Sequence, residues 1–379
     1  MVTRRRIVIV GAGQRFISGV SYYTYFLTRR LAEDHDVSVV LMRSIIPRFL
    51  YPGRARVGAP ISPLRTSDVA PTYDGINWTL IPSLWRAHRF MSSQRPEIVI
   101  LQWWSVANLV SYLLISRMAR RRRMKVILEM HEGIETAEAR IPLLRSISQW
   151  GLTHLVQRAD WCVVHSDFDR TAFSAQFGVP LDRVMVVPLG PFEVAGESVK
   201  AARTSEAITI LFFGTIRPYK GLEDLVDAFD ALPRDSQTWR LLIVGETWEG
   251  WNLPLEKVAT SPHRDDIEVI NRYVTDNEIP ALFARSDLIA LPYLRSSASG
   301  PLHLAMARGL PVVVTAVGGL EQAVAGYAGA VTVEASNPLL LRDGIVEAVG
   351  LVGGVFHDPH SWDQTAAAFE DVFTKLGSR

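Results

Sequence analysis

The chain of 379 residues has a single cysteine, Cys162, so it can form neither an internal disulfide nor a cysteine-ligated zinc or iron–sulfur site. It also has no excess of charge of one sign, because 40 Lys and Arg residues face 39 Asp and Glu residues. The resulting net charge of +1 excludes a globally basic nucleic-acid-binding protein. The low cysteine content is typical of a reducing compartment, and we expect a cytoplasmic protein.

Long apolar runs are absent as well. No stretch reaches the roughly 18 uninterrupted apolar residues that a membrane span requires. The basic N-terminus is followed by only four apolar residues, Ile7–Val10, before Gly11. A secretory signal needs an apolar run of about 7–15 residues. This first run therefore predicts a strand rather than a leader.

Short apolar runs alternate with longer amphipathic stretches, which indicates parallel strands joined by helical crossovers. A polar stretch after Pro191 is typical of a linker, and the alternation restarts beyond it. The expected strands of the first half are Arg6–Val10, Val37–Met42, Ile98–Gln102, Lys125–Met130, Trp161–His165 and Val184–Val187. Those of the second half are Ile208–Gly214, Arg240–Gly245, Ile267–Ile270, Leu288–Leu291 and Pro311–Thr315.

The sequence therefore predicts an α/β protein with two Rossmann-like domains. We expect the N-terminal domain over residues 1–190, a linker over 191–206 and the C-terminal domain over 207–357. A final helix within 358–379 is expected to pack back on the N-terminal domain, because its apolar residues recur at helical spacing. Two such domains usually bind a ligand at the carboxyl ends of their strands.

The first glycine-rich loop resembles a dinucleotide-binding turn only in part. Gly11 and Gly13 follow a strand, but Phe16 occupies the third glycine position. The second expected strand is followed by Arg43 rather than by an acidic ribose ligand. An NAD site is therefore disfavoured. The loop is either a tight strand–helix turn or, around Gly19, a helix start whose amides hold a phosphate.

Two cations follow the first strand of the second half. Arg217 and Lys220 lie between Gly214 and a helix that starts after Gly221. A planar guanidinium and a compact ammonium suit a diphosphate, although a solvated basic loop is the alternative. Further along, a loop of small residues ends at Ser299, and a helix with proline near its start follows. Its first amides, at Ser299, Gly300 and Leu302, could receive phosphate oxygens.

Three segments carry a resemblance to a known family: FFGTIRPYKGLEDLVDAF, RYVTDNEIPALFARSDLIALPY and SGPLHLAMARGLPVVVTAVGGLEQAV. Over about residues 208–324, their order and spacing resemble the retaining, nucleotide-sugar-dependent glycosyltransferases of the group 1 (family 4) class. The first half agrees more loosely. The resemblance implies a GT-B fold, with two Rossmann-like domains facing across a cleft. It also implies transfer of a sugar from a nucleoside-diphosphate sugar to a hydroxyl acceptor, with no metal and no further cofactor.

The resemblance also implies roles for individual residues. The donor diphosphate would be bound by Arg217, Lys220, Ser299, Gly300, Leu302 and Gly19. The base and ribose would lie near Gly214, Tyr273, Val274 and His303. The donor sugar would lie near Ser296 and Glu321, and His131 would be the histidine that contacts the transferring sugar. For His131 the alternative is a structural histidine whose hydrogen bonds are satisfied within the core.

One departure from the family pattern is clear. The family usually carries two glutamates eight positions apart, and here those positions hold Ser296 and Leu304. His303 or Glu321 could replace one of the two contacts. The departure leaves two alternatives open: a non-catalytic nucleotide-sugar-binding partner subunit, and a nucleotide-sugar epimerase or hydrolase of the same fold.

The apolar stretch Trp103–Met118 begins with two tryptophans and runs into RMARRRRMK, which holds six basic residues. Such a segment, over Trp103–Lys125, could contact the inner face of an anionic membrane peripherally. The alternative is a buried crossover helix whose basic last turn complements the helix dipole. Neither reading requires a nucleic-acid partner.

Overall fold

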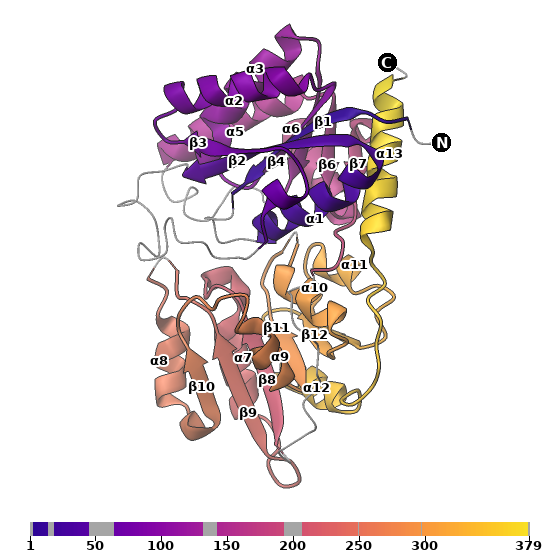
Figure 1. Cartoon of the computed structure of the whole chain (residues 1–379). Coiled ribbons are helices and arrows are strands. Elements are labelled where there is room, and N and C mark those ends of the chain that lie inside the picture. Colours follow the sequence, from indigo (N-terminus) through magenta and orange to yellow (C-terminus); the bar gives the residue numbers. More distant parts are fainter. Residues whose placement is uncertain are drawn as a thin grey trace. The chain divides into compact units, whose positions relative to one another are not determined.

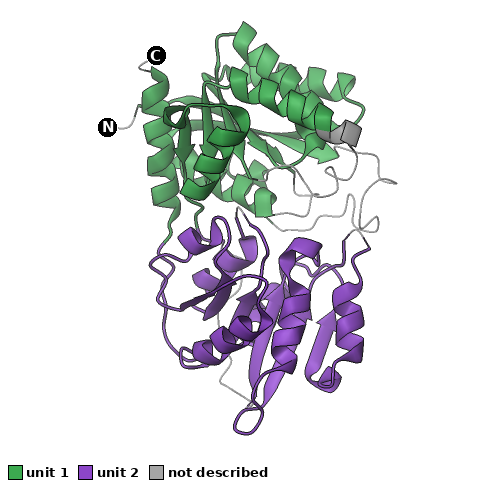
Figure 2. Ribbon diagram, turned by 180° about the vertical axis from the view of Figure 1, so that it is seen from behind, with its two compact units in different colours: residues 1–190, 360–379 green, residues 191–359 purple. Residues whose placement is uncertain are grey.

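The computed structural model of the chain describes residues 3–13, 19–44, 64–131, 142–192, 207–248, 250–296 and 298–377. The chain divides into two compact units (Figure 2). Unit 1 comprises residues 1–190 together with 360–379, and unit 2 comprises residues 191–359. The expected linker falls at the start of unit 2, and its residues 193–206 lie outside the described part of the chain.

The described part of unit 1 contains a seven-stranded parallel sheet with the order β3-β2-β1-β4-β5-β6-β7. The order reverses between β1 and β4, as in nucleotide-binding sheets. Its strands are β1 Arg6–Ala12, β2 Asp36–Ser44, β3 Thr72–Asn77, β4 Ile98–Trp103, β5 Lys125–Met130, β6 Trp161–Val164 and β7 Val184–Val186.

The helices of unit 1 cover both faces of this sheet because each presents an apolar stripe. The residues buried on α2, α3 and α5 join one core cluster with the strands, so these helices lie on the same face (Figure 1). On the other face, α13 packs against α1, and Arg30 of α1 pairs with Asp363 at 2.6 Å. The helices are α1 Gly19–Asp34, α2 Ile81–Gln94, α3 Leu109–Arg121, α5 Pro142–Arg158, α6 Asp167–Phe177 and α13 Trp362–Gly377.

The described part of unit 2 contains a six-stranded parallel sheet with the order β10-β9-β8-β11-β12-β13. Here the order reverses between β8 and β11, whose ends therefore flank the position where α/β sheets bind ligands. The strands are β8 Ile208–Phe213, β9 Trp239–Val244, β10 Ile267–Ile270, β11 Leu288–Leu291, β12 Val312–Thr315 and β13 Ala330–Val333.

The helices of unit 2 follow these strands in turn. Helix α7 is strongly amphipathic, and its apolar residues join the strands and α12 in one core cluster. The helices are α7 Leu222–Asp230, α8 Leu253–Thr260, α9 Ile279–Ala284, α10 Gly300–Ala307, α11 Leu320–Ala323 and α12 Pro338–Val349. Short 3₁₀ turns occur at Thr66–Asp68, Val106–Asn108, Leu181–Arg183, Pro218–Lys220 and Arg264–Asp266.

The α/β class and the two Rossmann-like sheets are confirmed, and the expected strands agree with the observed ones to within two residues at each end. Two edge strands, β3 and β13, were not expected. The tryptophans at the start of the suspected membrane segment are buried: Trp103 ends β4 and Trp104 follows it. Among the described residues, no helix is both long and apolar enough to cross a bilayer.

Candidate functional site

The switch point of unit 2 is formed by two loops that contact each other closely. One follows β8 and contains Arg217 and Lys220, and the other follows β11. Gly221 closes the first loop at φ +61°, and a Cβ there would lie 2.0 Å from the Pro292 carbonyl oxygen. The amide of Leu294 also donates to the Tyr219 carbonyl at 2.8 Å. These contacts fix the cations of the first loop beside the second loop.

Lys220 is only 7% exposed, and its ammonium group lies over an aromatic ring. Its Nζ lies 3.6 Å from the centroid of Tyr293 and 5.1 Å from that of Tyr219. Tyr293 is fully buried, its hydroxyl accepts from Ser299 Oγ at 3.3 Å, and its carbonyl accepts from Thr315 at 2.5 Å. Tyr293 therefore links the β8 loop, α10 and β12, and it fixes the position of the ammonium group.

Arg217 adds a second buried cation. Its guanidinium lies 4.3 Å from the ring centroid of Trp248, and the residue is 9% exposed. Its Nε is buried, and no acceptor for it exists among the described residues. A buried donor without an acceptor is unusual and calls for an explanation, such as a ligand oxygen. Arg295, whose Cζ lies 5.2 Å from the centroid of Tyr219, increases the positive charge around this loop.

Helix α10 starts at the same switch point with Ser299 as its N-cap. Gly300 begins the helix, and the Leu302 amide donates to Ser299 Oγ at 3.3 Å. The Leu302 amide was expected to be free for a phosphate, but it already has a partner in the serine hydroxyl. A phosphate oxygen would therefore have to share this amide with Ser299 Oγ or displace the hydroxyl. The end of α10 nevertheless directs its amides and the positive end of its dipole towards the cation loop.

The remaining residues expected near the nucleotide occupy neighbouring loops of unit 2. Gly214 directly follows β8 and has φ +130°, and a Cβ there would lie 3.4 Å from Pro301. Tyr273 and Val274 follow β10, and Val274 is buried. The β8, β9 and β10 loops are connected in a row, by a bridge between Ile216 and Thr247 and by hydrogen bonds from Thr247 to Asn271.

Three further expected residues lie around α10 and α11. His303 is buried inside α10, with its ring centroid 5.9 Å from that of Phe192. The Ser296 carbonyl accepts from the Gly319 amide at 3.0 Å, which places Ser296 beside the loop before α11. Glu321 is exposed on the first turn of α11. Leu304 is buried, so an apolar side chain occupies the position of the family's second glutamate.

In unit 1, His131 directly follows β5 and belongs to a buried polar cluster. Its Nδ1 lies 3.1 Å from Nε2 of His165, and its Nε2 lies 3.7 Å from Glu129 Oε2. Glu129 is fully buried and accepts from the Tyr23 hydroxyl at 2.5 Å and from Gln102 at 3.0 Å. Because His165 and Glu129 face opposite ring nitrogens, the three side chains form a row with His131 in the middle.

Burial and charge oppose each other in this cluster. Burial alone would raise the pKa of Glu129, but the neighbouring His131, together with His165 and Tyr23, lowers it below its ordinary value. Burial, followed by the nearby charge of His131, lowers the pKa of His165 to about 4. The cluster therefore holds a carboxylate and a neutral second histidine around neutral pH.

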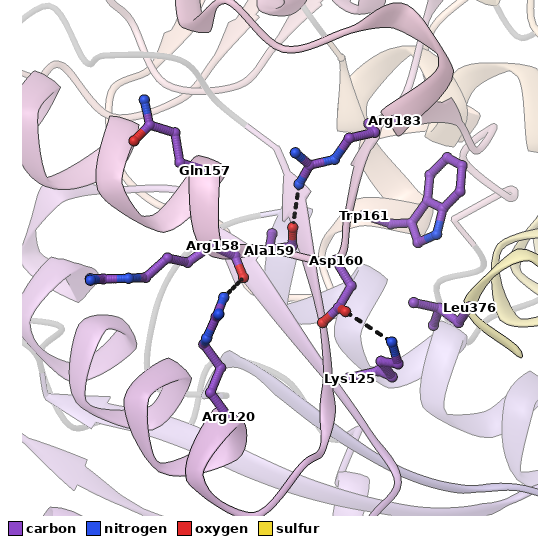
Figure 3. Close-up of a pocket in the computed structure, with 9 residues that line it drawn as sticks. All are labelled: Arg120, Lys125, Gln157, Arg158, Ala159, Asp160, Trp161, Arg183 and Leu376. Carbon is purple, nitrogen blue, oxygen red and sulfur yellow. Dashed lines mark hydrogen bonds and ion pairs between the residues drawn. The ribbon is translucent and has the colours of Figure 1, made fainter. Parts of the chain in front are cut away.

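Gly19, the expected phosphate neighbour in unit 1, is the exposed first residue of α1. The preceding loop residues, 14–18, lie outside the described part of the chain. A separate pocket of about 280 Å³ lies at the opposite, amino-terminal edge of the sheet (Figure 3). Lys125 and Trp161, the first residues of β5 and β6, line it, so it is distinct from the cluster around His131.

Sequence reasoning did not single out Tyr293, Glu129 or His165. Tyr293 had one signal, since it follows a buried strand next to a loop with two cations. The two histidines could have been found by aligning the two expected strands that precede them. Glu129 pairs with Val163, so His131 and His165 come two positions later on both strands and must lie side by side.

Comparison with known proteins agrees with these features. The model of the glycosyl transferases group 1 family matches residues 207–350, and that of the glycosyl transferase 4-like domain matches residues 18–190. The two matches together cover most of the chain. The chain belongs to the group 1 glycosyltransferases.

Similar curated proteins include the D-inositol 3-phosphate glycosyltransferase of Xylanimonas cellulosilytica, which is 27% identical over 228 residues. That alignment covers 54% of this chain and 54% of the relative, so the aligned part spans about half the length of the curated relatives it matches.

Solved structures share the GT-B fold of this glycosyltransferase. HepE from Anabaena, in complex with UDP, superimposes with a TM-score of 0.68 at 14% identity, covering 99% of this chain and 100% of HepE. The catalytic domain of starch synthase IV from Arabidopsis thaliana, bound to ADP and acarbose, gives 0.69 at 10% identity and covers 100% of both chains.

Proposed function

We propose that this glycosyltransferase transfers a sugar from a nucleoside-diphosphate sugar to a hydroxyl acceptor, with retention of the anomeric configuration. The observation that carries the proposal is the cation site at the switch point of unit 2, above all the buried Arg217 Nε that lacks an acceptor within the described chain. A diphosphate supplies the oxygens that Arg217, Lys220 and the α10 amides are suited to receive. The UDP bound by HepE and the ADP bound by starch synthase IV support a donor of this class.

The chemistry follows from these charges. The bond between the anomeric carbon and the diphosphate oxygen breaks while the acceptor oxygen bonds to the same face of that carbon. The acceptor proton passes to the leaving phosphate oxygen, so no strong side-chain base is required. Lys220 and Arg217 would stabilise the charge that develops on the leaving group. Removing one such group typically lowers kcat by about 10²–10³-fold.

Transfer would require no divalent metal, because two side-chain cations would already neutralise the diphosphate. Addition of EDTA is therefore expected to leave turnover unchanged, whereas a loss that Mg²⁺ or Mn²⁺ restores would refute metal independence. The remaining site residues keep their proposed places: Tyr273, Val274, Gly214 and His303 near the nucleoside, and Ser296 and Glu321 near the sugar. His131 and Gly19 of unit 1 would act on the sugar and the phosphate.

Turnover tests this function directly. The protein is incubated with UDP-, GDP-, ADP-, CDP- and dTDP-sugars, with D-inositol 3-phosphate as the first acceptor because several curated relatives are named for it. We expect one donor to release its nucleoside diphosphate together with a glycoside, whose anomeric proton coupling in NMR matches that of the donor. Binding of a donor without consumption would instead favour a non-catalytic partner subunit, which the loss of both family glutamates also suggests.

We also propose that unit 1 contacts an anionic membrane surface, through a different set of side chains from the one expected. Trp103 and Trp104 are buried and therefore cannot contact a membrane. Helices α2, α3 and α5 cover one face of the sheet (Figure 1). Large apolar side chains of these helices are exposed instead. We call this set the apolar face; it comprises Ile81, Trp85, Val110, Leu114, Ile147 and Trp150.

Exposed arginines lie close to the apolar face. Arg117, Arg120 and Arg121 lie on α3 beyond Leu114, and Arg122 and Arg123 directly follow this helix. Arg89 of α2 lies over the ring of Trp85. Tryptophans and arginines on one surface favour the interface of an anionic bilayer. The double variant Trp85→Ser/Trp150→Ser should lose binding to phosphatidylglycerol vesicles, whereas Val355→Ser, an exposed residue of unit 2, should keep it. This contact would be contradicted if the double variant bound phosphatidylglycerol vesicles as well as Val355→Ser does. It would also be contradicted if the wild-type protein bound phosphatidylcholine vesicles equally well.

A further inference from the structure

A second histidine of unit 1, His165, contacts the histidine that the proposed function places at the sugar. It directly follows β6, as His131 directly follows β5, and both are nearly buried. The strand alignment puts the two side chains next to each other, with ring centroids 4.7 Å apart. The function proposed above gives His165 no role.

The hydrogen-bond partners of His165 fix the direction of its hydrogen bonds. Its Nδ1 lies 2.9 Å from the Val187 carbonyl oxygen, which can only accept. Nδ1 must therefore carry a proton and donate. In the neutral ring, the proton on Nδ1 leaves a lone pair on Nε2, and this atom lies 3.1 Å from His131 Nδ1. The hydrogen bond between the rings then requires that His131 Nδ1 carries the proton.

The neutral state of His165 follows from its surroundings. Burial, and then the charge of His131, lower the pKa of His165 to about 4, whereas Glu129 and the Val187 carbonyl raise it by less. The imidazole is therefore uncharged between pH 6 and 8 and remains an acceptor on Nε2. On the other side of His131, Tyr23 and Gln102 hold both oxygens of Glu129, which keeps the carboxylate 3.7 Å from His131 Nε2.

We infer that His165 is a positioning residue for sugar transfer: it fixes the ring orientation of His131 and keeps the proton on His131 Nδ1. This role rests on the proposed function, because it presumes that His131 acts at the sugar. The side chain that faces the donor would then be presented in one orientation with a proton on Nδ1, which lowers the cost of reaching the productive geometry. A second-layer hydrogen bond commonly selects the tautomer of a functional histidine in this way.

The test combines a kinetic and a spectroscopic measurement. His165→Leu removes the acceptor, whereas His165→Gln can still accept from His131 through its amide oxygen and donate to Val187 through its amide nitrogen. His35→Leu serves as the matched control. His35 is also buried in unit 1, where it pairs with Glu370 and packs on Phe373, remote from the cluster. Thermal denaturation of all variants shows whether each remains folded at the assay temperature.

We expect His165→Leu to lower kcat by about 100-fold, the usual cost of displacing a reacting group by about 1 Å. The donor KM should stay unchanged because the cation site belongs to unit 2. His165→Gln should recover most of kcat, and His35→Leu should keep it. In ¹⁵N-histidine NMR spectra of the whole protein, the signals of His131 should show a protonated Nδ1 in the wild type and should change in His165→Leu.

Two results would overturn the inference. One is a His165→Leu protein that turns over donor at the wild-type rate, and the other is a wild-type His131 with no proton on Nδ1. A wild-type protein that consumes no donor would refute the proposed function and the kinetic half of this inference. In that case the NMR measurement, which needs no turnover, still decides whether His165 keeps a proton on His131 Nδ1.

Discussion

Gly221 connects the conformation of the cation loop to donor binding, and its replacement by alanine gives a quantitative prediction. The residue has φ +61°, a backbone conformation that costs an L-residue about 1–2 kcal/mol. The new Cβ would also lie 2.0 Å from the Pro292 carbonyl oxygen. Since ordinary contacts of this kind begin at 3.4 Å, the two loops would have to separate by the difference, 1.4 Å.

Two consequences follow for Gly221→Ala. With an added overpacking cost of about 1–3 kcal/mol, the free energy of unfolding should fall by about 2–5 kcal/mol. A displacement beyond 1 Å should also move Lys220 away from Tyr293, and misplacement on this scale can cost about 100-fold in function. We therefore expect a marked loss of nucleoside-diphosphate affinity in addition to the loss of stability.

Gly250→Ala is the matched control. Gly250 belongs to the same unit and has φ +68°, but a Cβ there meets no atom within 4 Å. This variant should lose only the conformational cost of about 1–2 kcal/mol, or roughly 2–8 °C in the unfolding midpoint of a unit of this size. Urea denaturation and titration calorimetry with nucleoside diphosphates measure both quantities. Equal stability and equal affinity of the two variants would refute the reasoning about the contact with Pro292.

Three further predictions concern single side chains and the solution conditions. Tyr293→Leu should weaken nucleoside-diphosphate binding by about 10-fold because it removes the ring under Lys220, a contact worth about 1–2 kcal/mol, whereas Tyr293→Phe should bind as the wild type does; equal loss in both variants would assign the effect to the hydroxyl group. Burial raises the pKa of Asp276 to about 6, so the stability linked to this group is fully present below pH 3.8 and is lost as the pH rises through 6. Asp276→Asn should therefore flatten the dependence of unfolding free energy on pH between 4 and 6, and an unchanged slope would contradict it. Increasing salt should weaken binding to phosphatidylglycerol vesicles, since the arginines next to the apolar face are exposed, and salt-independent binding would exclude their contribution.

The sequence predicted the central strands well because they are buried on both faces and form continuous apolar runs. Of the four edge strands in the described part of the chain, β7 and β10 were expected, whereas β3 and β13 were not. Strand β3 contains Asp74 and Gly75 and has only one fully buried side chain, at Ile76, so its sequence resembles a loop. The segment is extended because it pairs with β2, and its own sequence carries no clear strand pattern.

The candidate site was predictable to a similar extent. Arg217 and Lys220 were identified because cations at the end of a first strand have a chemical meaning that depends little on distant residues. The aromatic rings beneath them were not, since the contact of Lys220 with Tyr293 depends on how the two loops pack. The Trp103–Met118 segment shows the reverse problem: its composition suits a membrane, but the fold buries its tryptophans and exposes others on α2 and α5.

Calorimetric titration with UDP, GDP, ADP, CDP and dTDP measures directly whether the cation site of unit 2 binds a nucleoside diphosphate. At 100 times its dissociation constant, a bound nucleotide should also raise the free energy of unfolding by about 2.7 kcal/mol. We expect at least one nucleoside diphosphate to bind the wild type, and Lys220→Ala to weaken this binding at least about 10-fold by the loss of a charge-assisted contact. Lys257→Ala, which removes an outer lysine paired with Asp227, should bind as the wild type does. A donor site at Lys220 would be contradicted if no nucleoside diphosphate bound, or if the Lys220→Ala protein bound it with unchanged affinity.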